Sequence, residues 1–244
     1  MNSPGHFSGV GVGPGSRGYI SVAALQALQA CDLIYLPKAR GVEASVAQTC
    51  LAGLGLDEAK YREVEFLMVA DRSRLQDHYS ELAATIAADL RQGLHVGYVT
   101  LGDAMTYSTY GYTLAALRDL LPDLRYRSYP GVTSYAAAAA ALDWPLGEGR
   151  ERVLILPCPD DMQALRRDIE SHDIVVLMKV AQRLPSVLAL LDEMAIAAHC
   201  ALVSHIGLPG EMLYPTLADA EIDPAAGYLT TLLIRRNPRP RRHR

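Results

Sequence analysis

Short apolar segments alternate with segments of helical pattern along most of the chain, and this alternation limits the folds open to it. Apolar runs predict strands at 7–12, 33–36, 94–101, 124–129, 152–156, 174–178, 201–203 and 228–234. Apolar residues at helical spacing predict helices at 19–30, 42–54, 72–91, 110–121, 134–142, 161–170 and 183–194. Strands that alternate with helices are typical of α/β proteins. We therefore expect an α/β fold.

A break at Pro122-Asp123 divides the chain into two parts of similar size. A domain commonly has about 100–200 residues, so 244 residues suffice for two modest ones. We expect α/β domains at 1–121 and 122–244. The second ends in an arginine-rich tail, 235–244, which is either a solvated terminus or an electrostatic aid for a polycarboxylate ligand.

Composition excludes several classes of protein. The formal net charge of -4 gives no general attraction for nucleic acid or an anionic membrane. No apolar run approaches the about 18 residues of a membrane span, and the first residues lack the pattern of a secretion signal. We expect a cytoplasmic protein. The four cysteines are scattered without a CxxC pair, which predicts small buried side chains and no metal site.

A glycine-rich segment follows the first expected strand. Residues 13–18 (GPGSRG) match the GxGxxG pattern of dinucleotide-binding loops. Pro14 has no backbone N–H to offer a pyrophosphate, and the second strand ends in Leu36-Pro37-Lys38 without the acidic residue that would hold a ribose. A tight turn between strand and helix is the alternative, and this segment alone does not decide between them.

Three later segments also follow apolar strands: 101–104 (LGDA), 130–134 (PGVTS) and 176–179 (VLMK). With 11–15 (GVGPG), their order and spacing resemble the tetrapyrrole methylase family, the class III methyltransferases. The resemblance extends over residues 7–234. It implies two α/β domains with an interdomain cleft for S-adenosylmethionine, and a homodimer.

Further segments narrow the resemblance. Residues 32–38 (DLIYLPK), 102–110 (GDAMTYSTY), 129–142 and 144–157 are most similar to the family members that methylate precorrin-2, or its cobalt complex, at C20 in cobalamin biosynthesis. This implies a C-methyltransferase whose small-molecule substrate is a tetrapyrrole. Two alternatives remain: methylation of another corrin position by the same scaffold, and a nucleotide-dependent oxidoreductase.

The resemblance also implies site residues. Those that match cofactor-binding positions are Pro14, Leu101, Gly102, Asp103, Thr106, Thr133, Ser134, Met178, Ile206 and Thr230. Candidates for substrate binding are Arg17, Lys38, Arg72, Tyr107 and Tyr110. Arginine and lysine suit a ring with many carboxylates, and the tyrosines either pack on that ring or fill an interface.

Two departures from the family pattern matter. The usual Gly-Asp-Pro is Gly102-Asp103-Ala104 here, which keeps the carboxylate. Asp103 either helps to hold the positively charged cofactor or stabilises the turn. The aspartate proposed as a proton acceptor in uroporphyrinogen-methylating relatives is absent, because Pro37-Lys38 occupies that place. No catalytic residue is assigned.

Overall fold

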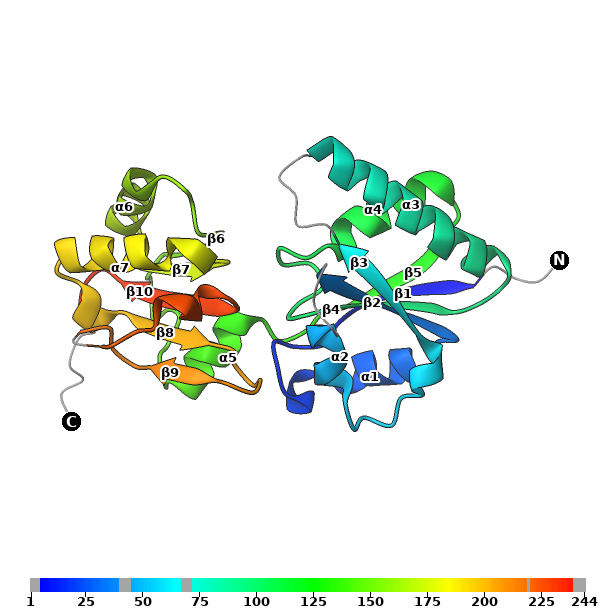
Figure 1. Cartoon of the computed structure of the whole chain (residues 1–244), viewed down its shortest axis with the longest axis horizontal. Coiled ribbons are helices and arrows are strands. Elements are labelled where there is room, and N and C mark those ends of the chain that lie inside the picture. The colour runs from blue at the N-terminus through cyan, green and yellow to red at the C-terminus, as the bar shows by residue number, and fades with distance from the viewer. Residues whose placement is uncertain (1–4, 40–44, 67–71, 219, 239–244) are drawn as a thin grey trace. The chain divides into compact units, whose positions relative to one another are not determined.

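The computed structural model describes residues 5–39, 45–66, 72–218 and 220–238. The chain divides into two compact units, Met1–Thr133 and Ser134–Arg244. Within the described ranges each unit has a five-stranded sheet with helices packed on it (Figure 1). The expected α/β class is confirmed.

The first unit is built on a parallel sheet with the strand order β3-β2-β4-β1-β5. Its strands are β1 (His6–Gly11), β2 (Leu33–Ala39), β3 (Tyr61–Phe66), β4 (Val96–Thr100) and β5 (Arg125–Tyr129). The β4, β1 and β5 strands are adjacent and parallel, so their carboxyl ends are neighbours at one edge of the sheet. The strand order reverses at this place, because β4 lies between β2 and β1. In open α/β sheets the loops at such a reversal of strand order are where ligands bind.

Helices cover both faces of this sheet (Figure 1). They are α1 (Val22–Gln29), α2 (Val46–Leu51), α3 (Arg72–Arg91) and α4 (Tyr110–Leu120), with short 3-10 turns at Arg17–Tyr19 and Glu58–Lys60. The α1 helix begins after Ser21, whose hydroxyl accepts a hydrogen bond from the Ala24 N–H at 3.2 Å. That side-chain bond satisfies one of the free N–H groups at the helix start.

Alternation along β1 decides which side chains meet α4. Phe7 stacks on Tyr110 with ring centroids 5.9 Å apart. Gly9 points to the same face, and a Cβ on it would lie 2.0 Å from the Tyr110 ring. A glycine at this position therefore lets the large, fully buried Tyr110 side chain lie against the strand.

The second unit has a mixed sheet with the order β6-β7-β10-β8-β9. Its strands are β6 (Val153–Pro157), β7 (Ile174–Met178), β8 (Ala201–Ser204), β9 (Met212–Tyr214) and β10 (Thr230–Arg235). The β6 and β7 strands are parallel, whereas β10 is antiparallel to both β7 and β8.

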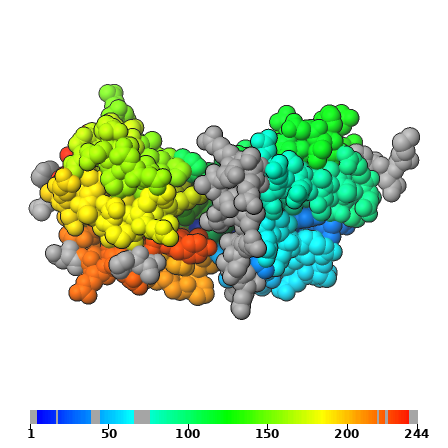
Figure 2. All heavy atoms as spheres, turned by 45° about the horizontal axis from the view of Figure 1, so that its top comes forward, coloured from blue at the N-terminus to red at the C-terminus, as the bar shows by residue number. Residues whose placement is uncertain are grey.

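Helices of the second unit enclose a separate core. They are α5 (Ser134–Ala141), α6 (Met162–Ser171) and α7 (Leu184–Glu193), with short turns at Ala181–Arg183, Ala197–His199 and Pro224–Gly227. The α6 and α7 helices lie on one face of the sheet and α5 on the other (Figure 1); in Figure 2 the yellow-green to yellow atoms of α6 and α7 form much of the surface turned to the viewer. Leu165 and Leu191 from these helices are fully buried with Val175 and Leu177 of β7.

The observed boundary and tail differ from those expected. The units divide after Thr133, and not between residues 121 and 122, because β5 pairs with β1 and so belongs to the first sheet. The arginine-rich tail does not begin as a solvated terminus, because Arg235 ends β10 and is buried. Residues 239–244 lie outside the described ranges.

Most other predicted helices and strands, and the predicted burial of the cysteines, agree with the structure. The α3 helix spans Arg72–Arg91 as predicted, and all four cysteines are buried and free. The β3 and β9 strands were not predicted. Residues 42–44 of the expected helix 42–54 lie outside the described ranges. None of the described helices is long and apolar enough to cross a membrane.

Candidate functional site

Three loops meet at the carboxyl edge of the first sheet. The loop after β1 and the loop after β4 form an isolated bridge between Gly13 and Gly102. The Gly13 N–H donates to the Gly102 carbonyl at 3.0 Å, and the Gly102 N–H donates back to the Gly13 carbonyl at 2.7 Å. The two loops are thus joined backbone to backbone.

Glycines allow the third loop, after β5, to reach the same point. A Cβ on Gly131 would lie 2.1 Å from the Gly102 carbonyl oxygen and 2.7 Å from the carbonyl carbon of Gly11. A Cβ on Gly11 would lie 2.7 Å from both the Gly102 oxygen and the Gly131 nitrogen. Only residues without side chains permit this approach of three backbones.

Asp103 connects the loops that follow β4 and β5. Its Oδ1 accepts from the Gly131 N–H at 3.0 Å, and its Oδ2 accepts from the Met105 N–H at 2.9 Å and the Thr106 hydroxyl at 3.0 Å. The turn-stabilising role that the sequence suggested for Asp103 is therefore confirmed. Asp103 and Thr106 are half-buried, so the carboxylate is held in place without being sealed from solvent.

The remaining first-unit candidates lie around this junction. Pro14 is buried directly after the Gly13 bridge, and Leu101 is half-buried directly before Gly102. Thr133 is half-buried at the end of the β5 loop. Tyr107 has a left-handed backbone (φ 52°) and an exposed side chain.

Tyr110 is not at this surface, which corrects its assignment to substrate binding. The side chain is fully buried among the aromatic residues of the core, and its hydroxyl lies 2.7 Å from Ser128 Oγ. Burial raises the pKa of this phenol. Tyr110 therefore joins α4 to β5 and offers no surface to a substrate.

The GPGSRG segment does not form a phosphate cradle. The Gly13 N–H is already bonded to Gly102, and Pro14 has no N–H. The α1 helix begins only at Val22, so its free N–H groups lie beyond the glycines that would have to present a pyrophosphate. The observed bridge favours the tight-turn interpretation over the dinucleotide one.

The second-unit candidates gather at one edge of the second sheet. Met178 ends β7, and Thr230 begins β10, which is antiparallel to β7 and brings these two ends to the same edge. Thr230 pairs with Ser204 at the end of β8, and the buried Ile206 follows two residues later. The Thr231 hydroxyl donates to Ser134 Oγ at 3.0 Å, which fixes the start of α5 to this edge.

Two hydroxyl groups at this edge hold the chain segment before β10. Thr230 Oγ1 donates to the Ala226 carbonyl, and Ser204 Oγ donates to the same oxygen at 3.1 Å. Both side chains are buried, so the visible role of the Thr230 hydroxyl is structural. Sequence reasoning missed Ser204, whose only signal was its place at the end of an apolar run.

The basic candidates differ in what the structure shows. Lys38, near the end of β2, forms an ion pair with Glu63 of β3 at 2.9 Å, and this hydrogen bond raises the pKa of the lysine. Arg17 lies in the 3-10 turn Arg17–Tyr19, and Arg72 is the first residue of α3; their side chains are outside what the structure describes.

Met105, which sequence reasoning missed, is 65% exposed beside Asp103.

No group of three or more histidine, cysteine, aspartate or glutamate side chains within the described ranges is arranged to hold a metal ion. The polar groups that meet at the loop junction include backbone amides and carbonyls, the Asp103 carboxylate and the Thr106 hydroxyl. Such a junction suits an organic ligand with a positively charged part.

Comparison with known proteins decides the family. The model of the tetrapyrrole (corrin/porphyrin) methylases matches residues 6–221. The chain belongs to the tetrapyrrole methylase family. The resemblance of the four sequence segments to this family is thereby confirmed. Members of the family are methyltransferases.

Individual relatives carry more specific names. A cobalt-precorrin-2 C(20)-methyltransferase of Salmonella typhimurium is 30% identical over 94% of this chain and 96% of its own. A precorrin-2 C(20)-methyltransferase of a Sinorhizobium species is 27% identical over 75% of this chain and 76% of its own. Among solved structures, a cobalt-precorrin-4 methyltransferase has a TM-score of 0.70 at 20% identity, covering 94% of both chains, and supports the tetrapyrrole methylase fold.

Proposed function

We propose that this tetrapyrrole methylase transfers a methyl group from S-adenosylmethionine to C20 of precorrin-2 or of its cobalt complex, in cobalamin biosynthesis. The names of the relatives support the position of methylation. The structural observation that carries the proposal is the junction of the three loops around Gly102, with Asp103 between them. We further propose a homodimeric, cytoplasmic enzyme, as the family resemblance implies.

The loop junction fits the methyl donor in two respects. S-adenosylmethionine supplies, when bound, an activated methyl group on a positively charged sulfur. An ionised carboxylate offers about four lone-pair sites, and Asp103 uses three of them within the protein. One acceptor position of this half-buried carboxylate is left for a cationic part of the ligand. Gly11 and Gly131 let the three loops pack backbone against backbone, and the absence of a side chain at Gly102 leaves open the direction in which its Cβ would point.

Two groups of residues, one in each unit, are proposed to bind the cofactor. On the first unit we assign Pro14, Leu101, Gly102, Asp103, Thr106 and Thr133 to cofactor binding. On the second unit we assign Ser134, Met178, Ile206 and Thr230. The support for this assignment is that each group gathers at one edge of its own sheet, and that these positions match cofactor-binding positions of the family.

The residues act by positioning rather than by acid–base chemistry. Displacement at a methyl carbon gains from alignment of donor and acceptor and from exclusion of water. The bonded loops provide fixed backbone groups for that alignment. Lys38 is paired with Glu63, which raises its pKa and keeps it protonated, so it serves as a cation and not as a base.

For the tetrapyrrole we propose a surface that combines exposed and cationic residues. Tyr107 is 44% exposed and Met105 65% exposed, both in the loop that carries Asp103. Either side chain provides apolar area for the ring to pack on. Arg17, Lys38 and Arg72 are assigned to the ring carboxylates, which guanidinium and ammonium groups bind through charge-assisted hydrogen bonds.

The decisive experiment is product analysis. Purified protein is incubated with S-adenosylmethionine and either precorrin-2 or cobalt-precorrin-2, and the product is analysed by mass spectrometry and NMR. We expect one added methyl group at C20, and the faster of the two reactions identifies the metal state of the substrate. A methyl group at another ring position would overturn the C20 assignment while leaving the methyltransferase assignment intact.

The cofactor site is tested by Asp103→Ala. Loss of the acceptor for the Gly131, Met105 and Thr106 donors should weaken binding of S-adenosylhomocysteine at least tenfold in calorimetry. Asp119→Ala, which removes an exposed carboxylate of α4, is the matched control and should bind normally. Unchanged binding by Asp103→Ala, or tight binding of NADH by the unmodified protein, would contradict the proposed site.

A further inference from the structure

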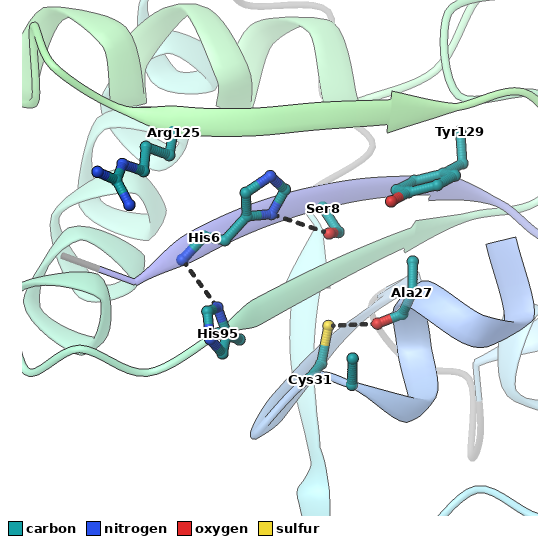
Figure 3. A pocket seen from close by; sticks show the side chains of 8 residues that line it. His6, Ser8, Ala27, Cys31, His95, Arg125 and Tyr129 are labelled. Carbon is teal, nitrogen blue, oxygen red and sulfur yellow. Dashed lines mark hydrogen bonds between the residues drawn. The ribbon is translucent and has the colours of Figure 1, made fainter. Parts of the chain in front are cut away.

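A cavity of about 320 Å³ lies on the first unit, lined by residues of β1 and β5, by the end of α1 and by His95 (Figure 3). His6 begins β1, His95 directly precedes β4, and Arg125 begins β5. These are the amino ends of parallel strands, whereas the three loops follow the carboxyl ends. The charged end of the cavity therefore lies at the opposite edge of the sheet from the proposed cofactor site.

One wall of the cavity presents nitrogen donors. His95 Nδ1 accepts from the His6 backbone N–H at 3.1 Å, which leaves the Nε2–H of a neutral His95 ring as a donor. His6 Nδ1 lies 3.3 Å from the hydroxyl of Ser8, a buried side chain that also lines the cavity. In Figure 3 the Arg125 side chain extends from β5 near the His6 ring.

The positive charge on this wall is not neutralised. In the described part of the chain, no ion pair or hydrogen bond joins the Arg125 side chain to another residue. Arg127, two residues further along β5, lies over the Tyr129 ring at 5.1 Å, and Tyr129 lines the cavity. The Asp32 carboxylate accepts from the His95 backbone N–H at 2.8 Å, not from the ring. An anion entering the cavity would meet the unpaired guanidinium of Arg125.

The other wall is apolar and uncharged. Ala27, Ala30 and Cys31 line it from the end of α1. The Cys31 thiol donates to the Ala27 carbonyl at 3.1 Å, and burial raises the pKa of this thiol to about 12. The cysteine is therefore neutral at physiological pH and acts as a small apolar side chain.

We propose that this cavity binds a small organic anion, with its carboxylate or phosphate group at His6, His95 and Arg125 and its apolar part against α1. The size supports this ligand class, because pockets for small molecules commonly measure about 300–1,000 Å³. The arrangement also supports it, because a charge-assisted hydrogen bond to an oxyanion is stronger than a neutral one. The proposal is independent of the methyl-transfer activity.

The position of His6 in this cavity also predicts that anion binding depends on pH. Burial lowers the pKa of His6, and the neighbouring His95, Arg127 and Arg125 lower it further. A bound anion opposes the positive charge of the arginines and raises the pKa of His6 again. Benzoate remains an anion between pH 7 and pH 5.5, so its affinity should rise over that interval as His6 takes up a proton.

The test uses the full chain with benzoate, phenyl phosphate and the uncharged benzamide. Imidazole NMR signals of His6 and His95, assigned with His6→Gln and His95→Gln, are followed during titration. We expect saturable shifts with at least one of the two anions and none with benzamide. The anion that binds more tightly identifies the charged group. Equal shifts with benzamide, or no shift with either anion, would overturn the proposal.

The Arg125→Gln variant tests whether the Arg125 guanidinium binds the anion. This variant of an exposed residue should weaken anion binding at least fivefold, whereas Arg118→Gln, an exposed arginine of α4, should leave it unchanged. Binding of S-adenosylhomocysteine by Arg125→Gln should equal that of the unmodified protein, which separates this cavity from the cofactor site. An Arg125→Gln variant that binds both anions normally would refute the assigned wall.

Discussion

Gly131 has no side chain, and this allows the loop after β5 to lie against the loop after β4. The atom nearest to an added Cβ is the Gly102 carbonyl oxygen at 2.1 Å, and backbone cannot turn aside as a side chain can. Gly131→Ala should therefore lower the free energy of unfolding by about 1–3 kcal/mol, in the range of overpacked sites. It should also weaken S-adenosylhomocysteine binding, measured by calorimetry.

Gly111 provides the matched control at the same scale. It lies in α4, and nothing is found within 4 Å of an added Cβ. Gly111→Ala should raise the free energy of unfolding by about 0.5–1 kcal/mol, because alanine loses less backbone entropy in a helix. If the two variants change stability and binding alike, close backbone approach is not the reason for Gly131.

Individual site residues could be predicted where the residues next to them in the sequence indicated their position in the fold. Gly102 and Asp103 directly follow a buried apolar strand, and the structure places both at the loop junction. Tyr110 was assigned to the substrate in error. The residue that decides its orientation is Gly9, about a hundred positions away in the sequence, and a single sequence does not reveal that pairing.

At the scale of elements, the contact of α4 with β5 depends on the Tyr110–Ser128 hydrogen bond. The oxygens are 2.7 Å apart and the phenol is buried. Tyr110→Phe keeps the ring packing and should cost about 0.5–1.5 kcal/mol, the usual net value of such a bond. Urea unfolding of Tyr110→Phe, Ser128→Ala and the double variant measures it.

The double variant distinguishes the bond from unrelated effects. Because both substitutions remove the same hydrogen bond, the double variant should be about as stable as the less stable single one. Fully additive losses would show that the two hydroxyl groups stabilise the protein separately, and that α4 is held to the sheet by packing alone.

Elements were predictable in proportion to their apolar pattern. The buried β4 and β7 were found because they are continuous apolar runs. The β3 strand was missed because its sequence, YREVEF, carries three charged residues, as an edge strand in solvent permits. The boundary between the units was misplaced because Pro122-Asp123 marks a turn before β5, and a turn does not tell to which sheet the next strand belongs.

At the scale of the whole molecule, each unit has its own buried core, and the two sheets share no strand. Trp144, the single tryptophan of the chain, belongs to the second unit. The Arg235 guanidinium lies 5.1 Å from its ring, donates to the Pro145 carbonyl at 3.2 Å and pairs with Glu151. Tryptophan fluorescence thus reports on the second unit, whereas far-UV circular dichroism reports on both.

Arg235→Gln should uncouple these two signals in urea. Removing one partner of a largely buried ion pair costs about 3 kcal/mol, so the fluorescence transition should move to lower urea and the dichroism transition should become biphasic. Arg236→Gln, whose pair with Asp173 is about one-third exposed, should move it little, by about 0–1 kcal/mol. Gly131→Ala, in the first unit, should leave the fluorescence midpoint in place. Coincident transitions in Arg235→Gln, or an equal fluorescence shift in Gly131→Ala, would mean that the two cores unfold as one cooperative unit.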